Sequence, residues 1–338
     1  MQEALFWEGL EGKAVRCTLC RFHCRIGAGH RGRCGVRENV DGRLNTLVYG
    51  LAVAANVDPI EKKPFFHVAP GSRAFSIATV GCNFRCRHCQ NYGISQSPHE
   101  SGRIVGDPLP PREVVAQALA AGCGSVAYTY TEPTIFYEYA LDTAQLAREA
   151  GLLNLFVSNG YIERAPLERI APLLDAANID LKGFNPTVHR ELTGAELSGV
   201  LDGLRDYRRL GIWLEVTTLV IPTINDSDAE LQAIARFIRD ELGAATPWHV
   251  SAFFPTYQLL DKPPTPPATV LRARDIGLAA GLQHVYSGNL PGSDGESTAC
   301  SGCGRIVIAR HGYHLGAMAL KEGKCRACGT QLAGIKLA

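Results

Sequence analysis

Short apolar runs alternate with longer segments of helical periodicity through the middle of the chain. The strand-like runs cover residues 74–80, 125–130, 153–157, 178–181, 212–221, 249–254 and 284–286. Helical patterns lie between most of them, at residues 112–121, 138–150, 166–176, 196–210, 228–242 and 269–280. Alternating strands and helices predict parallel βαβ units, so the fold class is α/β. Periodicity leaves open whether the sheet is doubly wound or forms a full or partial barrel.

The two ends of the chain lack this pattern and are rich in Cys and Gly. Residues 51–72 contain the pairs Asp58-Pro59, Lys63-Pro64 and Pro70-Gly71, which are typical of an irregular, extended stretch. These shifts in composition predict four parts. They are an N-terminal Cys-rich metal-binding module (1–50), a linker (51–72), a core domain (73–292) and a C-terminal module (293–338).

Composition and charge exclude several classes of function. Of the 338 residues, 46% are hydrophobic and 20% are charged, and the formal net charge is +1. This balance argues against nucleic-acid or membrane-surface binding through bulk charge. The first residues have neither the basic nor the apolar region of a signal peptide, and no apolar run has the length needed to cross a bilayer. We therefore expect a cytoplasmic protein that does not associate with membranes.

The chain has 12 cysteines, and all but Cys123 fall into three tight groups. In a cytosolic protein, cysteines two or three residues apart are more often metal ligands than disulfide partners. Cys123 is typical of a small buried hydrophobic residue, and we assign it no role. His249, in the sixth predicted strand, is as typical of a core histidine as of a ligand.

The central group, Cys82, Cys86 and Cys89, directly follows the first strand of the core. Cysteines at these spacings can converge from one loop. Three thiolates on a [4Fe–4S] cluster leave one iron open to a small molecule, whereas a fourth ligand would close it. The alternative is a zinc site with His88 as the fourth ligand. Zinc is less favoured because structural zinc sites usually hold small, loop-rich modules.

This Cys-x₃-Cys-x₂-Cys loop resembles the signature of the radical S-adenosylmethionine (SAM) superfamily. The flanking residues, from Ile60-Glu61-Lys62-Lys63-Pro64 to Cys89-Gln90-Asn91, resemble the radical SAM enzymes of the AmmeMemoRadiSam system, which are similar to pyruvate formate-lyase activating enzymes. The resemblance covers both Cys-rich ends. It implies a partial (β/α) TIM-like barrel, a [4Fe–4S] cluster and SAM. His88 stands where the family prefers an aromatic ring beside the adenine, and its imidazole can stack there.

The resemblance also assigns SAM-binding roles to residues at three strand ends, where ligands of parallel barrels bind. Glu132 matches the acidic residue of a Gly-Gly-Glu-Pro-like turn that contacts the SAM amine, although the glycine pair is missing here. Ser158 and Asn159 match a Thr-Asn-Gly turn. Asp180 and Lys182 match an Asp-Leu-Lys motif near the SAM carboxylate. The alternatives are a helix N-terminal charge at Glu132, an ordinary Asn-Gly turn and a surface ion pair.

The two outer groups of cysteines are expected to hold structural metals. Cys300-x₂-Cys303 and Cys325-x₂-Cys328, each followed by a glycine, predict a zinc ribbon. At the N-terminus, the spacing of Cys17, Cys20, Cys24 and Cys34 fits either zinc or a second iron–sulfur cluster, and it differs from that of a bacterial ferredoxin, which favours zinc slightly. His23 and His30 can substitute as ligands.

The resemblance implies an oxidoreductase in which flavodoxin or ferredoxin reduces the cluster. The electron then cleaves SAM to methionine and a 5′-deoxyadenosyl radical, which abstracts hydrogen from a substrate. The substrate is a glycine of a partner protein or a small molecule handled with the system's partner proteins. The rival function is a non-enzymatic zinc-binding interaction protein. No catalytic residue beyond the cofactor ligands is predicted.

Overall fold

A computed structural model describes residues 2–290 and 294–337, and these residues divide into two compact units. The first unit comprises residues 1–58, 73–177 and 199–212, and the second comprises residues 59–72, 178–198 and 213–338. The predicted boundary between residues 292 and 293 lies outside the described residues. Each of the seven predicted core strands has a counterpart, which confirms the α/β class.

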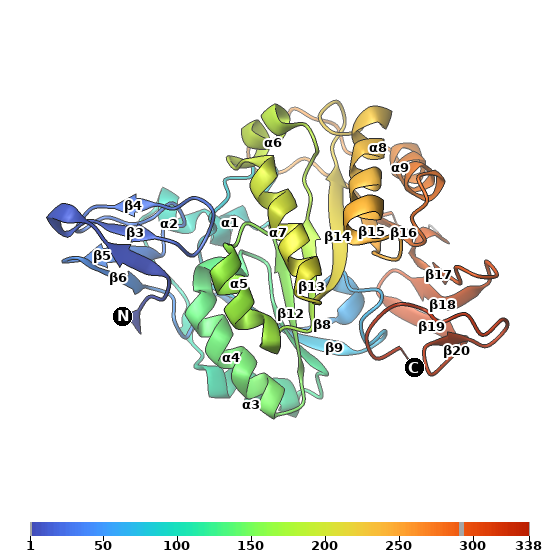
Figure 1. The fold of residues 1–338 in the computed structure, drawn as a ribbon, viewed down its shortest axis with the longest axis horizontal. Coiled ribbons are helices and arrows are strands. Elements are labelled where there is room, and N and C mark those ends of the chain that lie inside the picture. The colour runs from blue at the N-terminus through green and yellow to red at the C-terminus, as the bar shows by residue number, and fades with distance from the viewer. Residues whose placement is uncertain (1, 291–293, 338) are drawn as a thin grey trace. The chain divides into compact units, whose positions relative to one another are not determined.

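The core of the first unit is a run of parallel strands covered by helices (Figure 1). Its parallel strands are almost wholly buried, which explains why they have continuous apolar sequences. Ser125 pairs with both Leu153 and Ala74, so β11 lies between its neighbours in the sheet. The parallel strands are β9 (Arg73–Ala78), β11 (Ser125–Tyr128) and β12 (Leu153–Ser158), and β8 (Ala54–Pro59) lies beside β9 and runs antiparallel to it. The helices are α3 (Pro111–Ala120), α4 (Tyr137–Glu149), α5 (Arg164–Ile170) and α7 (Leu197–Arg209).

The second unit repeats this arrangement with its own parallel strands. Ser227 caps the helix that begins at Asp228 by accepting a hydrogen bond from the backbone N–H of Glu230. The strands are β14 (Trp213–Val220), β15 (Trp248–Ala252) and β16 (Val285–Gly288), and β13 (Ala176–Asp180) spans the division between the units. The helices are α6 (Pro186–Thr193), α8 (Asp228–Phe237) and α9 (Pro267–Ala279).

Strand order decides between the two α/β architectures. In the first unit the order is β8-β9-β11-β12, and in the second it is β14-β15-β16. Within each run, neighbouring strands are hydrogen-bonded to one another. A doubly wound sheet reverses its strand order at a switch point, whereas a (β/α) barrel places consecutive strands side by side. Because neither run reverses, the fold is of the (β/α) barrel type.

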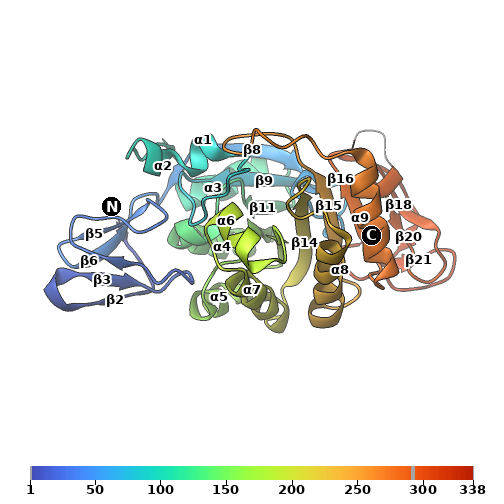
Figure 2. The ribbon, with the colours of Figure 1, turned by 90° about the horizontal axis from the view of Figure 1, so that it is seen from above.

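The N-terminal fifty residues form two small antiparallel sheets (Figure 2). Arg37 anchors them to the first unit: its guanidinium, almost fully buried, donates to Glu138 of α4 at 2.8 Å and to the carbonyl of Leu5 at 2.6 Å. A buried charge pair of this kind is strongly destabilising to break. The sheets are β1 (Gln2–Glu3), β6 (Arg43–Thr46) and β5 (Arg37–Val40), and β2 (Trp7–Gly9), β3 (Val15–Cys17) and β4 (Arg25–Ile26).

The segment 51–72, which we expected to be a linker, contains more structure than its prolines suggest. Strand β7 (Leu51–Ala52) pairs with β10 (Asp107–Pro108), and β8 joins the main sheet. Ile60 and Phe65 are fully buried, and Pro64 accepts a hydrogen bond from the side chain of Asn178 at 2.7 Å. Long-range contacts, which local turn signals do not report, hold this stretch in place.

The C-terminal module is a set of short antiparallel strands (Figure 2). Its core is very small and consists mainly of Val307, Ile308, Leu320 and Leu332. So few apolar residues rarely stabilise a module without a metal or other cross-link. The strands are β17 (Thr298–Ala299), β18 (Ile306–His311), β19 (His314–Met318), β20 (Leu320–Lys321) and β21 (Lys324–Cys325). Throughout the described residues, every helix is too short or too polar to cross a lipid bilayer.

Candidate functional site

The loop that carries Cys82, Cys86 and Cys89 begins at the carboxyl end of β9. Gly81 starts it with a φ of 99°, and a Cβ there would lie 2.6 Å from a methyl of Val36, so only glycine fits. The Cys82 sulfur accepts a hydrogen bond from the backbone N–H of Phe84 at 3.4 Å. Burial raises the pKa of Cys82 well above its ordinary value, and the neighbouring acidic groups raise it further. A bound cation would favour the ionised form of the Cys82 thiol.

The buried carboxylate of Glu132 joins the ends of β11 and β12. Its Oε1 accepts hydrogen bonds from the backbone N–H of Thr134 (2.9 Å), the Thr134 hydroxyl (2.6 Å) and the Ser158 hydroxyl (2.8 Å). Its Oε2 accepts one, from the backbone N–H of Asn159 at 2.8 Å. Burial raises the pKa of Glu132, and these hydrogen bonds oppose that rise. Glu132 thus holds both predicted strand-end turns together.

Glu132 and its partners Thr134, Ser158 and Asn159 are called the Glu132 hub below. Asn83 connects this hub to the cysteine loop. Its Oδ1 accepts a hydrogen bond from Nδ2 of Asn159 at 2.7 Å, and it directly follows Cys82 in the chain. Its own Nδ2 is buried and has no hydrogen-bond acceptor among the described residues. A buried donor left unsatisfied costs about 1–3 kcal/mol, so it indicates that a ligand or water belongs beside it. Sequence reasoning missed Asn83, although an amide right after the first cysteine was a usable signal.

Tyr130 supplies the backbone geometry that the missing glycine pair would have given. Its φ is 62°, in the left-handed region that glycine adopts readily and a tyrosine rarely does. The Asn91 side chain donates to the Tyr130 carbonyl at 2.7 Å, and the Tyr130 hydroxyl bonds the carboxylate of Asp58. Such conformations cost about 1–3 kcal/mol and cluster at functional sites. The turn before Glu132 therefore adopts a left-handed backbone conformation at a tyrosine instead of a glycine.

The remaining predicted SAM ligands lie in two places. His88 is buried within the cysteine loop of the first unit. Asp180 and Lys182 belong to the second unit, where Lys182 Nζ donates to Asp180 at 2.7 Å at the carboxyl end of β13. The Lys182 side chain is only 15% exposed, so this pair is more buried than an ordinary surface ion pair.

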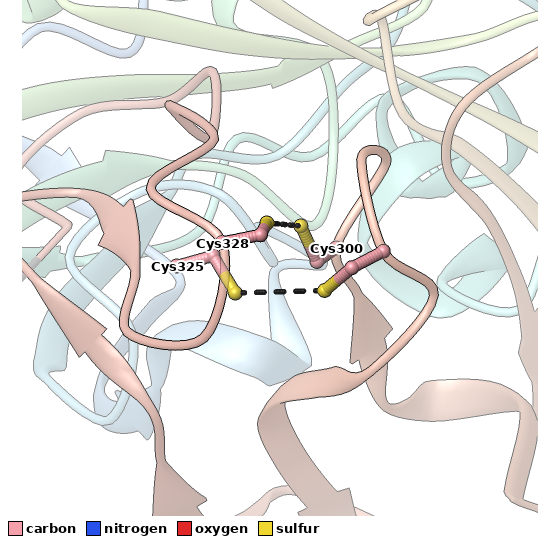
Figure 3. A group of neighbouring side chains, drawn as sticks. Cys300, Cys325 and Cys328 are labelled. Atoms are coloured by element: carbon pink, nitrogen blue, oxygen red, sulfur yellow. Dashed lines mark hydrogen bonds between the residues drawn. The ribbon is translucent and has the colours of Figure 1, made fainter.

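The C-terminal cysteines form a compact set. The Cys300 and Cys328 sulfurs are 3.6 Å apart, and those of Cys303 and Cys325 are 3.8 Å apart. Figure 3 shows Cys300 on one loop facing Cys325 and Cys328 on another. A tetrahedral ion with metal–sulfur bonds of about 2.3 Å places its sulfurs about 3.8 Å apart. Hydrogen bonds from Thr330 lower the pKa of Cys328 to about 6. The set is therefore preformed for a single metal ion.

The N-terminal cysteines gather around the β3–β4 hairpin. The backbone N–H of Cys17 donates to the carbonyl of Cys24 at 3.0 Å, and burial raises the pKa of Cys34 to about 12. Both nearby histidines are engaged elsewhere. His23 pairs with Glu163 at 3.0 Å, and Nδ1 of His30 contacts the carbonyl of Ala28 at 3.0 Å. Each contact involves one ring nitrogen, so the four cysteines are the first candidate ligands and the two histidines stay as alternatives.

His249 belongs to a buried network at the amino end of the strands of the second unit. Its Nε2 lies 2.6 Å from Glu215, whose carboxylate also accepts the backbone N–H groups of Phe66 and His67. His67 in turn contacts the hydroxyl of Tyr286 at 2.6 Å. In (β/α) folds the amino ends of the strands serve stability, whereas ligands bind at the carboxyl ends. His249 is therefore a core residue.

Comparison with known proteins agrees with this geometry. Residues 76–238 match the model of the radical SAM superfamily. The uncharacterized protein MJ0808 of Methanocaldococcus jannaschii is 44% identical over 98% of this chain and 99% of its own length. A putative glycyl-radical enzyme activating enzyme of the same organism, MJ1632, is 25% identical over 61% of this chain and 78% of its own.

A solved structure shows the same fold. The crystal structure of Streptococcus suis SuiB bound to S-adenosylmethionine superposes with a TM-score of 0.51 and 13% identity, covering 68% of this chain and 52% of SuiB. The matched region of the family model contains the three-cysteine loop, the Glu132 hub and the Asp180–Lys182 pair. The chain belongs to the radical SAM superfamily.

Proposed function

We propose that Cys82, Cys86 and Cys89 hold a [4Fe–4S] cluster and that SAM binds beside it at the carboxyl ends of β11 and β12. The observation that carries this proposal is the chain of contacts from the three-cysteine loop through Asn83 to Asn159 and Glu132. The residues fit the group, because three thiols leave one iron open and Asn83 Nδ2 needs an acceptor. When bound, the cluster supplies the electron that cleaves SAM to start radical chemistry.

The protein's own residues bind and orient the cofactor. Glu132 Oε2 accepts a single hydrogen bond, and a carboxylate has roughly four acceptor positions, so it can also receive the SAM ammonium group. The same carboxylate fixes the Ser158–Asn159 turn, so the polar atoms of this turn are already ordered before SAM binds. His88 is proposed to stack on the adenine, and the Asp180–Lys182 pair to bind the methionyl carboxylate. Asn83, Cys86 and His88 of the loop are buried, which limits the access of water beside them.

For the substrate, we propose a glycine of a partner protein, which would make the chain an activating enzyme for a glycyl-radical protein. The similarity to MJ1632, named as a putative activating enzyme of this kind, supports this assignment. The motif residues also support membership of the AmmeMemoRadiSam subgroup. The proposed reductant is a low-potential protein such as flavodoxin or ferredoxin, and the proposed C-terminal metal is zinc. A cytoplasmic location follows from this chemistry, because the cluster needs a reducing compartment.

The test is anaerobic reconstitution followed by addition of SAM and dithionite. We expect a brown protein that forms 5′-deoxyadenosine and methionine, and no products from the Cys82→Ala/Cys86→Ala/Cys89→Ala variant. A colourless protein that binds only zinc would support the non-enzymatic alternative. Undiminished cleavage in the triple variant would contradict the assignment of these ligands. For the substrate, the readout is a glycyl-radical EPR doublet in a candidate partner protein.

A further inference from the structure

We propose that Cys17, Cys20, Cys24 and Cys34 hold an iron–sulfur cluster that passes electrons to the three-cysteine loop. The destination of the electron rests on the proposed function, whereas the identity of the N-terminal metal group does not. Two independent observations carry the proposal. One is the spacing of the thiols, and the other is direct contact between the segments that carry the two sets of cysteines.

The thiol spacing differs between the two ends of the chain. Within the part of the chain that the structure describes, the C-terminal quartet is the set of three or more metal-ligating side chains whose ligand atoms all lie within 4.8 Å of one another. The N-terminal quartet is thus more widely spaced than a single tetrahedral ion requires, since its sulfurs would stand about 3.8 Å apart. In a [4Fe–4S] cluster each thiolate binds a different iron, so the cysteine sulfurs stand further apart than around a single ion.

The N-terminal thiols also have an environment suited to such a cluster. Cys17 and Cys34 are buried, and Cys20 and Cys24 are partly buried. Low solvent exposure tunes the reduction potential of iron–sulfur clusters. Four cysteines leave no iron open, which is typical of a cluster that transfers electrons rather than binding a substrate.

The segment that carries Cys34 packs against the loop that carries Cys82. A Cβ on Gly81 would lie 2.9 Å from the carbonyl oxygen of Cys34, so the two backbones touch where Gly81 has no side chain. One residue along, Arg33 Nε donates to the carbonyl of Asn83 at 3.1 Å. Because consecutive Cα atoms are about 3.8 Å apart, these contacts place the two sets of thiols on the order of 10 Å from each other.

Aromatic rings fill the space between the two loops. Phe22, which lies between Cys20 and Cys24, packs edge-on against Phe84, between Cys82 and Cys86, with ring centroids 6.3 Å apart. Tyr161 contacts both rings, at 4.8 Å from Phe22 and 5.3 Å from Phe84. Electron tunnelling weakens exponentially with distance and is faster through packed atoms than across a gap. The short, filled path therefore suits electron transfer.

The proposed step moves one electron at a time. A low-potential one-electron donor protein reduces the N-terminal cluster and is itself oxidised. The N-terminal cluster then gives this electron to the site at Cys82, Cys86 and Cys89 and returns to its oxidised state. The electron finally breaks the C5′–S bond of SAM, with methionine as the leaving group. No proton moves, and all four thiolates keep their iron ligands.

Metal analysis of full-length variants tests the identity of the group. The Cys82→Ala/Cys86→Ala/Cys89→Ala variant is expected to retain iron together with acid-labile sulfide after anaerobic reconstitution. Adding Cys20→Ser and Cys24→Ser to that variant is expected to remove both. Zinc without iron and sulfide at the N-terminal cysteines would overturn the proposal. Neither outcome depends on SAM cleavage, so failure here is distinguishable from failure of the proposed function.

The relay is tested first in the unmodified protein. When both clusters are reduced, their EPR signals are expected to be broadened by spin–spin coupling compared with the sum of spectra from the two single-cluster variants. Unbroadened, additive signals would contradict the close approach. In the Cys20→Ser/Cys24→Ser variant, cleavage driven by reduced flavodoxin is expected to fall about tenfold or more, with a much smaller loss when dithionite is the reductant. Equal flavodoxin-driven rates in variant and wild type would overturn the relay.

Discussion

Glu132 and Glu215 are both fully buried, yet the regions around them differ in what the carboxylate holds together. Glu132, at the carboxyl end of β11, accepts its hydrogen bonds from the turn residues Thr134, Ser158 and Asn159. Glu215, near the amino end of β14, accepts its hydrogen bonds from core groups that include His249. One carboxylate therefore organises the turns of the proposed SAM site, and the other organises the interior of the second unit.

The pKa values of the two carboxylates also differ. Burial raises the pKa of Glu132 despite its hydrogen bonds. Burial also opposes ionisation of Glu215, but the hydrogen bond and charge interaction with His249 outweigh it and lower the pKa of Glu215 to about 2. The negative charge of the Glu215 carboxylate is stabilised by its partners within the protein. The partners of the Glu132 carboxylate do not outweigh its burial, so a cationic ligand such as the SAM amine would stabilise its ionised form.

The largest expected effect is loss of the proposed C-terminal zinc, because structural zinc contributes about 10–16 kcal/mol to folding in small modules. The C-terminal module is hydrogen-bonded to the network around His67 and Phe66 through Thr298, Arg310 and Ala333. We therefore assign the proposed zinc a purely structural role. Cys325→Ala should unfold residues 298–337, as measured by hydrogen exchange. Cys123→Ala is the matched control and should leave this protection intact. A tail that stays protected in strong chelator would contradict the zinc-ribbon assignment.

The next largest effects are expected from substituting Glu215 and Glu132 one at a time. Glu215→Gln should lower the free energy of unfolding by about 3–5 kcal/mol, because it breaks a buried charge pair. The rate of SAM cleavage per folded chain should stay close to wild type. Glu132→Gln should instead reduce cleavage about tenfold or more, since the SAM amine loses a charged partner. Urea titration and product chromatography on both variants check this. A reversed pattern would contradict the division of roles.

Acid should destabilise the second unit through its buried histidines. Burial lowers the pKa of His67 to about 4 and that of His284 to about 3, from an ordinary value of 6.5. Between these values the unfolded chain binds protons that the folded chain does not, so stability falls as pH drops below 6.5. From pH 7 to pH 5 we expect a loss on the order of 3 kcal/mol. Denaturant titration measures it, and His284→Gln should flatten the slope; an unchanged slope would contradict this account.

The smallest effect sharpens the assignment of the ion pair at the end of β13. A charged contact to a ligand contributes about 1.5–3 kcal/mol, or roughly ten- to hundredfold in affinity. Asp180→Asn and Lys182→Met should each weaken SAM binding by this factor while cluster content and thermal stability stay near wild type. Calorimetry on the reconstituted variants measures the affinity. Wild-type affinity in both would remove the pair from the site.

The sequence predicted the elements whose signals are local. The buried strands and the amphipathic helices between them were predicted to within a few residues at most boundaries. Helix α6 and strand β8 were missed. Helix α6 is short, and β8 lies in a proline-containing stretch whose place in the sheet depends on pairing with distant residues.

Long-range contacts also explain what could not be predicted about the sites. The cysteine spacings identified three groups of ligands, but they did not show that the C-terminal thiols are preformed for one ion and the N-terminal thiols are not. Likewise, nothing local to His249 indicates its partner, which is 34 residues away. Asn83 became a site residue only when Asn159, 76 residues away, was placed beside it. Sequence motifs indicate which chemical groups are present, whereas the fold determines which of these groups come into contact.

The most direct test of the central claim is the EPR spectrum of the reduced cluster at Cys82, Cys86 and Cys89, recorded with and without SAM. The Cys20→Ser/Cys24→Ser variant isolates this cluster from any N-terminal signal. If SAM binds the open iron beside the Glu132 hub, its addition should shift the g values, and the shift should be much weaker in Glu132→Gln than in Glu215→Gln. A spectrum that SAM leaves unchanged in the Cys20→Ser/Cys24→Ser variant would contradict the account.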